Sequence, residues 1–471
     1  MKSPKILTGL LAVAFASPVF GATFEITGAT AFRAATITSI HALYKASGVA
    51  FRFSHNRATE ADFINADVVT FDGTITGLGP TVIRCSFNGS IEGLRALAQP
   101  GQTGIEGSNG DASYLKLSTA QTEAASTGEG TNIQNVANSG ANIERALAEM
   151  AFSDTDKAIS PYAADDMEGA SPGVNVFGLL VSEVASGQST IANVTAQQYN
   201  SLLTNGVVRM SQLTGLSSDS NRLVFCTGRN DGSGTRSSYL AEMGYGVANP
   251  VNQFLVVSST STNITAIQNV PAGGVNDSNP GLAGIQLPPG SAIQLWQAAG
   301  NTVTQNTTSA STVWGQDVNG NGGAFSGSAL RGDMGRIGAS VRVFSATGSD
   351  LYGNVPQNNI TLVTWITLND AITARAAGAT IAAFDGVSLS LNGGAGLNEL
   401  TATDKNKIYN GQYTAWNFQQ LYRRATADAD TVTLYDAIFG AIPNNLATAG
   451  LKNSDMKVGR AGDGGVINPI F

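Results

Sequence analysis

Charged side chains, histidine and cysteine are all scarce in this chain of 471 residues. Charged residues make up 13% of the composition, about half of the usual quarter. The only histidines are His41 and His55, and neither stands beside a cysteine or acidic cluster at ligand spacing. A metal site or a histidine-based catalytic triad is therefore not expected, and neither is a cofactor. The formal net charge of −8, with no basic patch, also argues against a nucleic-acid or anionic-membrane partner.

Long apolar runs are lacking as well. The run at the N-terminus, Ile6–Ala16, is too short to span a bilayer. Two lysines precede it, and Pro18 and small residues around Gly21 follow it, an order typical of a cleavable secretory signal peptide over residues 1–21. Because no cysteine lies near the cleavage site, a lipid anchor is not expected. The sequence predicts a periplasmic or secreted protein.

Glycine and small polar residues are abundant instead. There are 55 glycines, and three stretches rich in Gly, Ser, Thr and Asn read as loop insertions: Pro100–Gly140, Ala272–Gly290 and Asn301–Gly327. The last contains Asp317–Gly322, which has the pattern of the first half of a calcium loop. Ser328 stands where that loop needs a bidentate glutamate, so turn chemistry is the better interpretation.

The most informative stretch is Arg229–Arg236, R-N-D-G-S-G-T-R. An apolar run, Leu223–Cys226, precedes it, and a helical pattern follows, which predicts a glycine-rich turn between a buried strand and a helix. In that arrangement the backbone N–H groups of Gly234 and Thr235 face outward at the helix N-terminus, where negative charge is favoured. The hydroxyls of Ser233 and Thr235 add donors, and Arg229 adds a planar fork for two oxygens of one anion.

Asp231 is a carboxylate placed where an anion should bind. The presence of this carboxylate is explained if the ligand still carries a proton, as monohydrogen phosphate does, because the O–H of the ligand can then donate a hydrogen bond to Asp231. Sulfate has no such proton at neutral pH and would be disfavoured. A bare D-G-S-G can equally be a polar surface turn; the flanking arginine, threonine, strand and helix favour the anion site.

The order R-x-D-G-S-G-T resembles the anion loop of the second lobe in the phosphate-binding proteins of phosphate ABC importers, within the type II periplasmic binding protein superfamily. This resemblance implies three further ligand loops. The first, G-A-T-A-F, follows strand Thr23–Thr27 and offers the Thr30 hydroxyl or the Phe32 backbone, although Thr30 can also be only a helix N-cap. The second follows strand Val82–Ser86 and places a serine donor at Ser90.

The third implied loop is F-S-D, which follows a predicted helix at Ile143–Met150. The resemblance assigns to Asp154 the acceptance of the ligand's proton, with Asp156 as the alternative. Taken alone, an aspartate in this position is most often a solvated turn residue.

The expected architecture is α/β, with two lobes that are each an open mixed sheet flanked by helices, carry long loop insertions and bind the ligand between them. Val174–Val184, an almost continuous apolar strand, is expected to cross between the lobes. The boundaries predicted are 22–172 plus 396–471 for lobe 1 and 173–395 for lobe 2. A disulfide between Cys85 and Cys226 would pin such a cleft, so two buried, unpaired cysteines are favoured.

The resulting hypothesis is a monomeric, non-enzymatic protein that captures inorganic phosphate for the membrane permease of an ABC importer. An extracellular surface protein with the same fold, acting as a sensor or adhesin, is the alternative that the low-charge loops favour. A secreted hydrolase with Ser233 as nucleophile is disfavoured, because no histidine or G-x-S-x-G elbow accompanies it.

Overall fold

The computed structural model describes most of the chain. The described residues are 21–98, 111–160, 162–230, 232–249, 251–270, 296–299, 302–305, 323–324, 326–345, 349–393, 396–446 and 449–470. The expected signal peptide, apart from its last residue, lies outside them. Asp231, the segment 272–290 and the calcium-like stretch 317–322 also lie outside the described residues.

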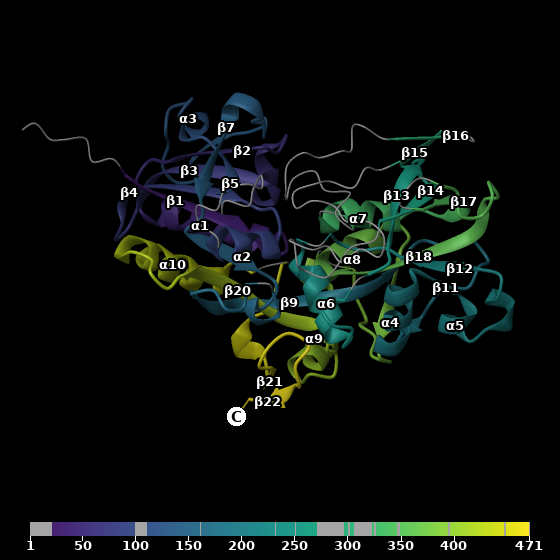
Figure 1. Cartoon of the computed structure of the whole chain (residues 1–471). Coiled ribbons are helices and arrows are strands. Elements are labelled where there is room, and N and C mark those ends of the chain that lie inside the picture. The colour runs from purple at the N-terminus through teal and green to yellow at the C-terminus, as the bar shows by residue number, and fades with distance from the viewer. Residues whose placement is uncertain are drawn as a thin grey trace, which may run out of the picture.

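The first hydrophobic core lies on one face of a mixed sheet. This sheet is built mainly from the N-terminal part of the chain (Figure 1). Its strands, in spatial order, are β8 Met150–Ser153, β1 Ala22–Gly28, β4 Gly79–Ser86, β3 Val68–Ile75, β2 Arg52–His55 and β6 Thr131–Ile133. Strand side chains alternate between faces: in β8, Met150 and Phe152 enter this core, whereas Ala151 packs against the opposite face. Helices α1 Arg33–Ala46 and α10 Ala429–Ala441 cover the first face, and α2 Ser90–Ala98 covers the second.

Two long strands connect this sheet to the rest of the molecule. β9, Met167–Val181, pairs along its first part with β20, Trp416–Arg424, and along its last part with β18, Gln357–Thr367. β20 in turn pairs with β8. The chain therefore leaves the first sheet along β9 and returns to it along β20. The apolar strand expected at Val174–Val184 lies largely within β9, which ends at Val181; its crossing between two lobes stays a prediction.

The second hydrophobic core contains the middle of the chain (Figure 1). Its strands are β10 Asn193–Val194, β11 Val207–Arg209, β12 Leu223–Cys226, β13 Phe254–Ser259, β14 Ile264–Asn269, β17 Gly338–Phe344, β18 and β19 Thr380–Phe384. Its helices are α4 Ala196–Asn205, α5 Ser211–Thr214, α6 Gly234–Glu242, α7 Gly327–Met334, α8 Leu368–Arg375 and α9 Ala402–Tyr409. Leu397, Leu400 and Ile408 pack here although the sequence assigned them to lobe 1; the lobe boundaries themselves stay a prediction.

Shorter elements complete the described chain. They are β5 Asp111–Leu115, α3 Leu117–Ala120, β7 Ile143–Leu147, β15 Trp296–Ala299, β16 Thr302–Gln305, β21 Val458–Gly459, β22 Asn468–Pro469 and the 3₁₀ helices η1 Glu60–Asn65, η2 Gly140–Asn142, η3 Lys157–Ile159, η4 Ser217–Asp219, η5 Gly396–Glu399, η6 Ile442–Asn444 and η7 Asn453–Asp455. β5, α3 and β6 lie within the stretch 100–140 that was expected to be loop. Within the part of the chain that the structure describes, no helix combines the length and the apolar character that crossing a membrane requires.

The expected α/β class with a large mixed sheet flanked by helices is confirmed, but the helix predicted at Ile143–Met150 is wrong. Residues Ile143–Leu147 form strand β7, which pairs antiparallel with β5, and Met150 begins β8. The predicted N-cap at Thr30 is also wrong, because α1 begins at Arg33 with Phe32 as its N-cap and no side-chain cap. Both cysteines are buried and unpaired, as favoured.

Candidate functional site

Three polar loops meet at one edge of the first sheet because their strands are parallel. β1 pairs in parallel with both β4 and β8, with Thr27 opposite Ser86 and Gly28 opposite Phe152. Parallel strands end at the same edge of a sheet, where open α/β sheets bind their ligands. The residues that follow these strands, at 29–32, 88–90 and 154–156, are therefore neighbours.

The Asp154 carboxylate is the centre of this meeting point and is 3% exposed. Its Oδ1 accepts a hydrogen bond from the hydroxyl of Ser90, the first residue of α2. Its Oδ2 accepts a 2.9 Å hydrogen bond from the hydroxyl of Thr235, the second residue of α6. One carboxylate thus joins a helix of the first sheet to a helix of the second core. We call Ser90, Asp154 and Thr235 the Asp154 cluster.

Helices α2 and α6 meet at their N-terminal ends. The backbone N–H of Ile91 donates to the carbonyl of Gly232 at 3.1 Å, and a Cβ on Gly89 would lie 2.6 Å from that same carbonyl oxygen. A Cβ on Gly234 would lie only 1.9 Å from Asp154 Oδ1, so both glycines are required for the close approach. Since two helix N-termini point at one place, negative charge is favoured there.

Ser233 is the N-cap of α6. Its hydroxyl oxygen accepts from the backbone N–H of Arg236 at 3.4 Å, which satisfies one of the free N–H groups of the first turn. The strand, turn and helix expected around this loop are confirmed by β12 and α6, whereas the assignment of Ser233 and Gly234 as anion ligands stays a prediction.

Arg229 is 3% exposed and lies in the turn between β12 and α6. Its Nε donates to the carbonyl of Ala324 at 3.0 Å, and its own carbonyl accepts from Gln253 Nε2 at 2.9 Å. Burial lowers the pKa of the Arg229 guanidinium, while the charges of Asp154 and Asp370 act in the opposite direction.

Burial also acts on the Asp154 carboxyl. It raises the pKa above the ordinary value for an aspartate, and the hydrogen bonds from Ser90 and Thr235 and the charge of Arg229 oppose that rise. A carboxyl group with such a raised pKa shares a proton with a ligand more readily than the carboxyl group of a solvated aspartate does. Asp156, the alternative candidate, instead caps a short helix by accepting from Ala158 N at 2.9 Å.

The role of the first loop, with Thr30 or the Phe32 backbone as a ligand contact, stays a prediction. The Phe32 side chain is fully buried in the first core, so only its backbone is left for a ligand. Thr30 is half-buried and lines a separate cavity rather than the Asp154 cluster. Asp231 lies outside the described residues.

Sequence reasoning missed two residues that support the cluster. Asn417 in β20 donates to the carbonyl of Asp154 and, at 2.6 Å, to Ser238 Oγ. Asp463, near the C-terminus, accepts from Thr155 Oγ1 at 3.0 Å and from Asp156 N at 2.9 Å. Neither residue stands in a local motif, so no sequence signal pointed to it. Among the described residues there is no group of three or more His, Cys, Asp or Glu side chains arranged to hold a metal ion.

Comparison with known proteins gives a likeness of fold. No family model and no curated protein matches the chain. A protein from Clostridium perfringens assigned as a phosphate ABC transporter substrate-binding protein, with bound phosphate, is 10% identical over 91% of this chain and 98% of its own, with a TM-score of 0.39. An ABC-type phosphate transport receptor from Vibrio cholerae is 10% identical over 90% and 97%, with a TM-score of 0.37. Both neighbours are named as proteins of the class that the Arg229 loop resembles.

Proposed function

We propose that this chain is an exported solute-binding protein that captures phosphate, or a similar protonated oxyanion, between its two lobes for an ABC importer. The observation that carries the proposal is that the Asp154 carboxylate accepts hydrogen bonds from two hydroxyl groups in the N-terminal turns of two helices. One is the hydroxyl of Ser90 in α2 and the other is that of Thr235 in α6. The first helix packs on the N-terminal sheet and the second packs in the second core. A ligand in this place would be held from both sides, as lobe closure requires.

In the proposed complex the two hydroxyls turn from Asp154 to the ligand. Ser90 and Thr235 then donate to oxygens of the anion, together with the backbone N–H groups at the start of α6. Arg229 supplies charge, and Asp154, released from the hydroxyls, accepts the remaining O–H of monohydrogen phosphate. Charge-assisted hydrogen bonds contribute about 1.5–3 kcal/mol each, so a few of them suffice for tight binding.

The same arrangement supports discrimination against sulfate. Sulfate carries no proton at neutral pH, so its oxygen would face the Asp154 carboxylate without a hydrogen between them. Repulsion in a buried site costs more than it does in water. Phosphate, or another protonated oxyanion such as arsenate, avoids this cost.

A surface protein or sensor outside transport is the second candidate. The observation that favours it is that each oxygen of the Asp154 carboxylate already has a hydroxyl partner, so the cluster is satisfied without a ligand. The two candidates differ in whether an anion stabilises the folded chain.

Thermal unfolding of the chain from Ala22 onward tests the proposal, with millimolar phosphate and, as the control, millimolar sulfate. A ligand at a hundred times its dissociation constant stabilises by about 2.7 kcal/mol. A rise in Tm with phosphate alone supports selective capture. A rise with both anions leaves a general oxyanion site, and no rise with either favours the surface-protein candidate.

A further inference from the structure

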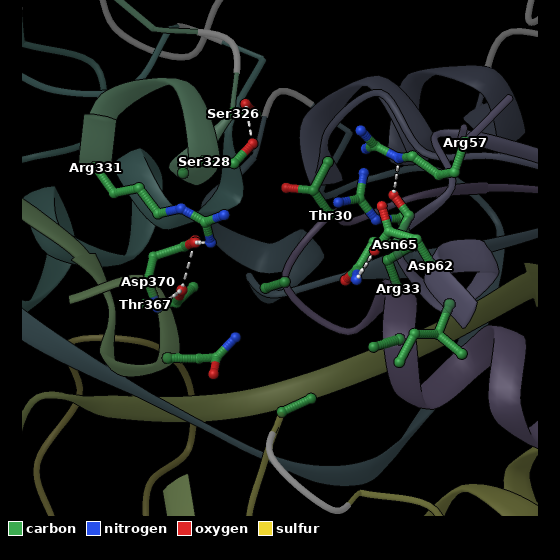
Figure 2. Close-up of a pocket in the computed structure, with 16 residues that line it drawn as sticks. Thr30, Arg33, Arg57, Asp62, Asn65, Ser326, Ser328, Arg331, Thr367 and Asp370 are labelled. Atoms are coloured by element: carbon green, nitrogen blue, oxygen red, sulfur yellow. Dashed lines mark hydrogen bonds and ion pairs between the residues drawn. The ribbon is translucent and has the colours of Figure 1, made fainter. Parts of the chain in front are cut away.

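A cavity apart from the Asp154 cluster opens between the two cores and has a volume of about 380 Å³. One wall comes from the start of α1 and from the segment around η1, with Thr30, Arg33, Arg57, Asp62 and Asn65. The other comes from the starts of α7 and α8 and includes Ser326, Ser328, Arg331, Thr367 and Asp370. Figure 2 shows these two sets of side chains on opposite sides of the cavity. The cavity is within the range of about 300–1,000 Å³ that is usual for organic ligands.

Two guanidinium groups of the first wall share one carboxylate oxygen. Arg33 Nη1 and Arg57 Nη2 both contact Asp67 Oδ1, at 2.5 and 3.0 Å. Two positive charges thus share one negative charge just behind the wall. The other guanidinium of the cavity, Arg331, reaches from the second wall and is paired with Asp370 at 2.8 Å.

The two walls are close enough to act on each other. Burial lowers the pKa of Arg33, Asp67 raises it, and Asp370 on the opposite wall raises it as well. An anionic ligand between the walls would therefore be attracted by arginine side chains on both sides. The three arginines are matched in number by Asp62 and Asp370 in the lining and Asp67 behind it, so an anion would be held by contacts with individual guanidinium groups rather than by an excess of positive charge.

Three helices begin at this cavity. α1 begins at Arg33, α7 at Gly327 and α8 at Leu368, directly after the lining residue Thr367. α1 has no side-chain cap at its first turn, so its N-cap side chain satisfies none of the first N–H groups. The three positive helix ends and the arginines favour the same sign of ligand charge.

The rest of the lining suits hydroxyl groups. Asp62, Asn65, Asn369 and Asp370 offer carboxylate and amide oxygens, and Thr30, Ser326, Ser328 and Thr367 offer hydroxyls. No aromatic side chain is among the described residues that line it, so these residues offer polar contacts and no ring for stacking. We propose that this cavity binds a phosphate monoester of a sugar or polyol, with the phosphoryl group at Arg57 and Arg331 and the hydroxyls at the aspartates and amides.

This inference goes beyond the proposed capture of phosphate. Its contacts differ from those of the Asp154 cluster, because no member of that cluster lines the cavity. Either site can therefore fail without the other. The separation gives the experiment two independent readouts.

Calorimetric titration with glucose 6-phosphate tests the cavity, with glucose and inorganic phosphate as the comparison probes. The variants are Arg57→Gln and Arg331→Gln. The matched control is Arg336→Gln, since Arg336 follows α7 in sequence, pairs with Asp333 at 2.5 Å and does not line the cavity. We expect glucose 6-phosphate to bind more tightly than glucose, and each lining variant to weaken it roughly tenfold to a hundredfold. Arg336→Gln should bind as the parent does.

Three results would overturn the inference. Glucose 6-phosphate could bind no better than glucose, or both lining variants could bind it as the parent does. Binding of glucose 6-phosphate could also be lost in Arg229→Ala and kept in Arg331→Gln. That result would place the ligand at the Asp154 cluster and would leave the proposed function standing. Conversely, the chain could bind glucose 6-phosphate in a manner that depends on Arg331 and fail to bind inorganic phosphate. That result would support the cavity site and contradict the proposed function. Thermal unfolding of each variant confirms that the fold is intact.

Discussion

The hydroxyl of Thr235 donates a 2.9 Å hydrogen bond to the carboxylate of Asp154, which lies 81 residues earlier in the chain. Thr235 belongs to a helix of the second core, and Asp154 follows a strand of the first sheet. The bond therefore links the two halves of the molecule at the point where both present helix N-termini. The proposed capture of phosphate depends on this contact.

Replacing Asp154 with asparagine should change selectivity more than stability. The amide of the new side chain keeps the shape of the carboxylate but removes the negative charge that repels sulfate. We expect Asp154→Asn to bind phosphate about tenfold more weakly, the loss of one charge-assisted bond, and sulfate no more weakly than the parent. Competition between the two anions measures the ratio. Asp156→Asn is the control and should leave the ratio unchanged; an unchanged ratio in Asp154→Asn would refute the role of Asp154.

Gly234→Ala should disrupt the cluster by steric overlap. The added Cβ would lie 1.9 Å from Asp154 Oδ1 and 2.5 Å from Ser90 Oγ, so the two helices must separate. Overpacking of this kind costs about 1–3 kcal/mol. Urea unfolding measures the loss, with Gly332→Ala in α7 as the control, because a Cβ there meets nothing within 4 Å. Equal stability of the two variants would show that the contact between α2 and α6 is looser than described.

Asp463 should make stability depend on pH. Burial raises the pKa of its carboxyl to about 7, above the value of about 3.9 for an unfolded aspartate. Because the folded state holds the proton more tightly, the stabilisation is fully present below about pH 4 and is lost as pH rises to about 7. The slope is at most about 1.4 kcal/mol per pH unit.

The variant Asp463→Asn removes this group's contribution. Its stability between pH 4 and 7 should fall less steeply than that of the parent, and it should be the more stable of the two at pH 8. The slope should not vanish, because burial also raises the pKa of Glu149 to about 8. Thermal unfolding across this pH range measures the difference; identical profiles would mean that Asp463 titrates as a solvated carboxyl.

The two cysteines should be inert in the folded protein. Cys85 and Cys226 are fully buried, and burial raises the pKa of both thiols well above the ordinary value, so the reactive thiolate is rare. A chromogenic disulfide reagent at pH 8 should label neither thiol in native protein and both in urea. Rapid labelling of native protein would contradict their burial, and no labelling in urea would indicate a disulfide.

Local chemistry explains what the sequence predicted correctly. The apolar run Leu223–Cys226, the polar turn after it and the helical pattern beyond predicted β12 and α6. These signals involve residues within a few positions of one another. Strand β9 was equally evident because it is buried over most of its length.

Long-range contacts explain what the sequence did not predict. Ile143–Met150 consists largely of good helix formers, but Glu144 pairs with Tyr114 in the β5–β7 ladder and forms an ion pair with Arg84. Tertiary pairing overrides local propensity there. Likewise, Asn417 reaches Asp154 from 263 residues away and Asp463 reaches Asp156 from 307, so no local pattern could place them at the site.

Calorimetric titration of phosphate into the parent protein and into Arg229→Ala is the most direct test of the central claim. We expect saturable binding of phosphate by the parent, and a loss of about 1.5–3 kcal/mol or more of binding free energy for the variant, because a buried charge proposed to contact the anion is removed. Arg336→Ala, away from the Asp154 cluster, serves as the control and should bind as the parent does. Equal phosphate binding by the parent and Arg229→Ala would contradict the account, because the anion would then bind elsewhere.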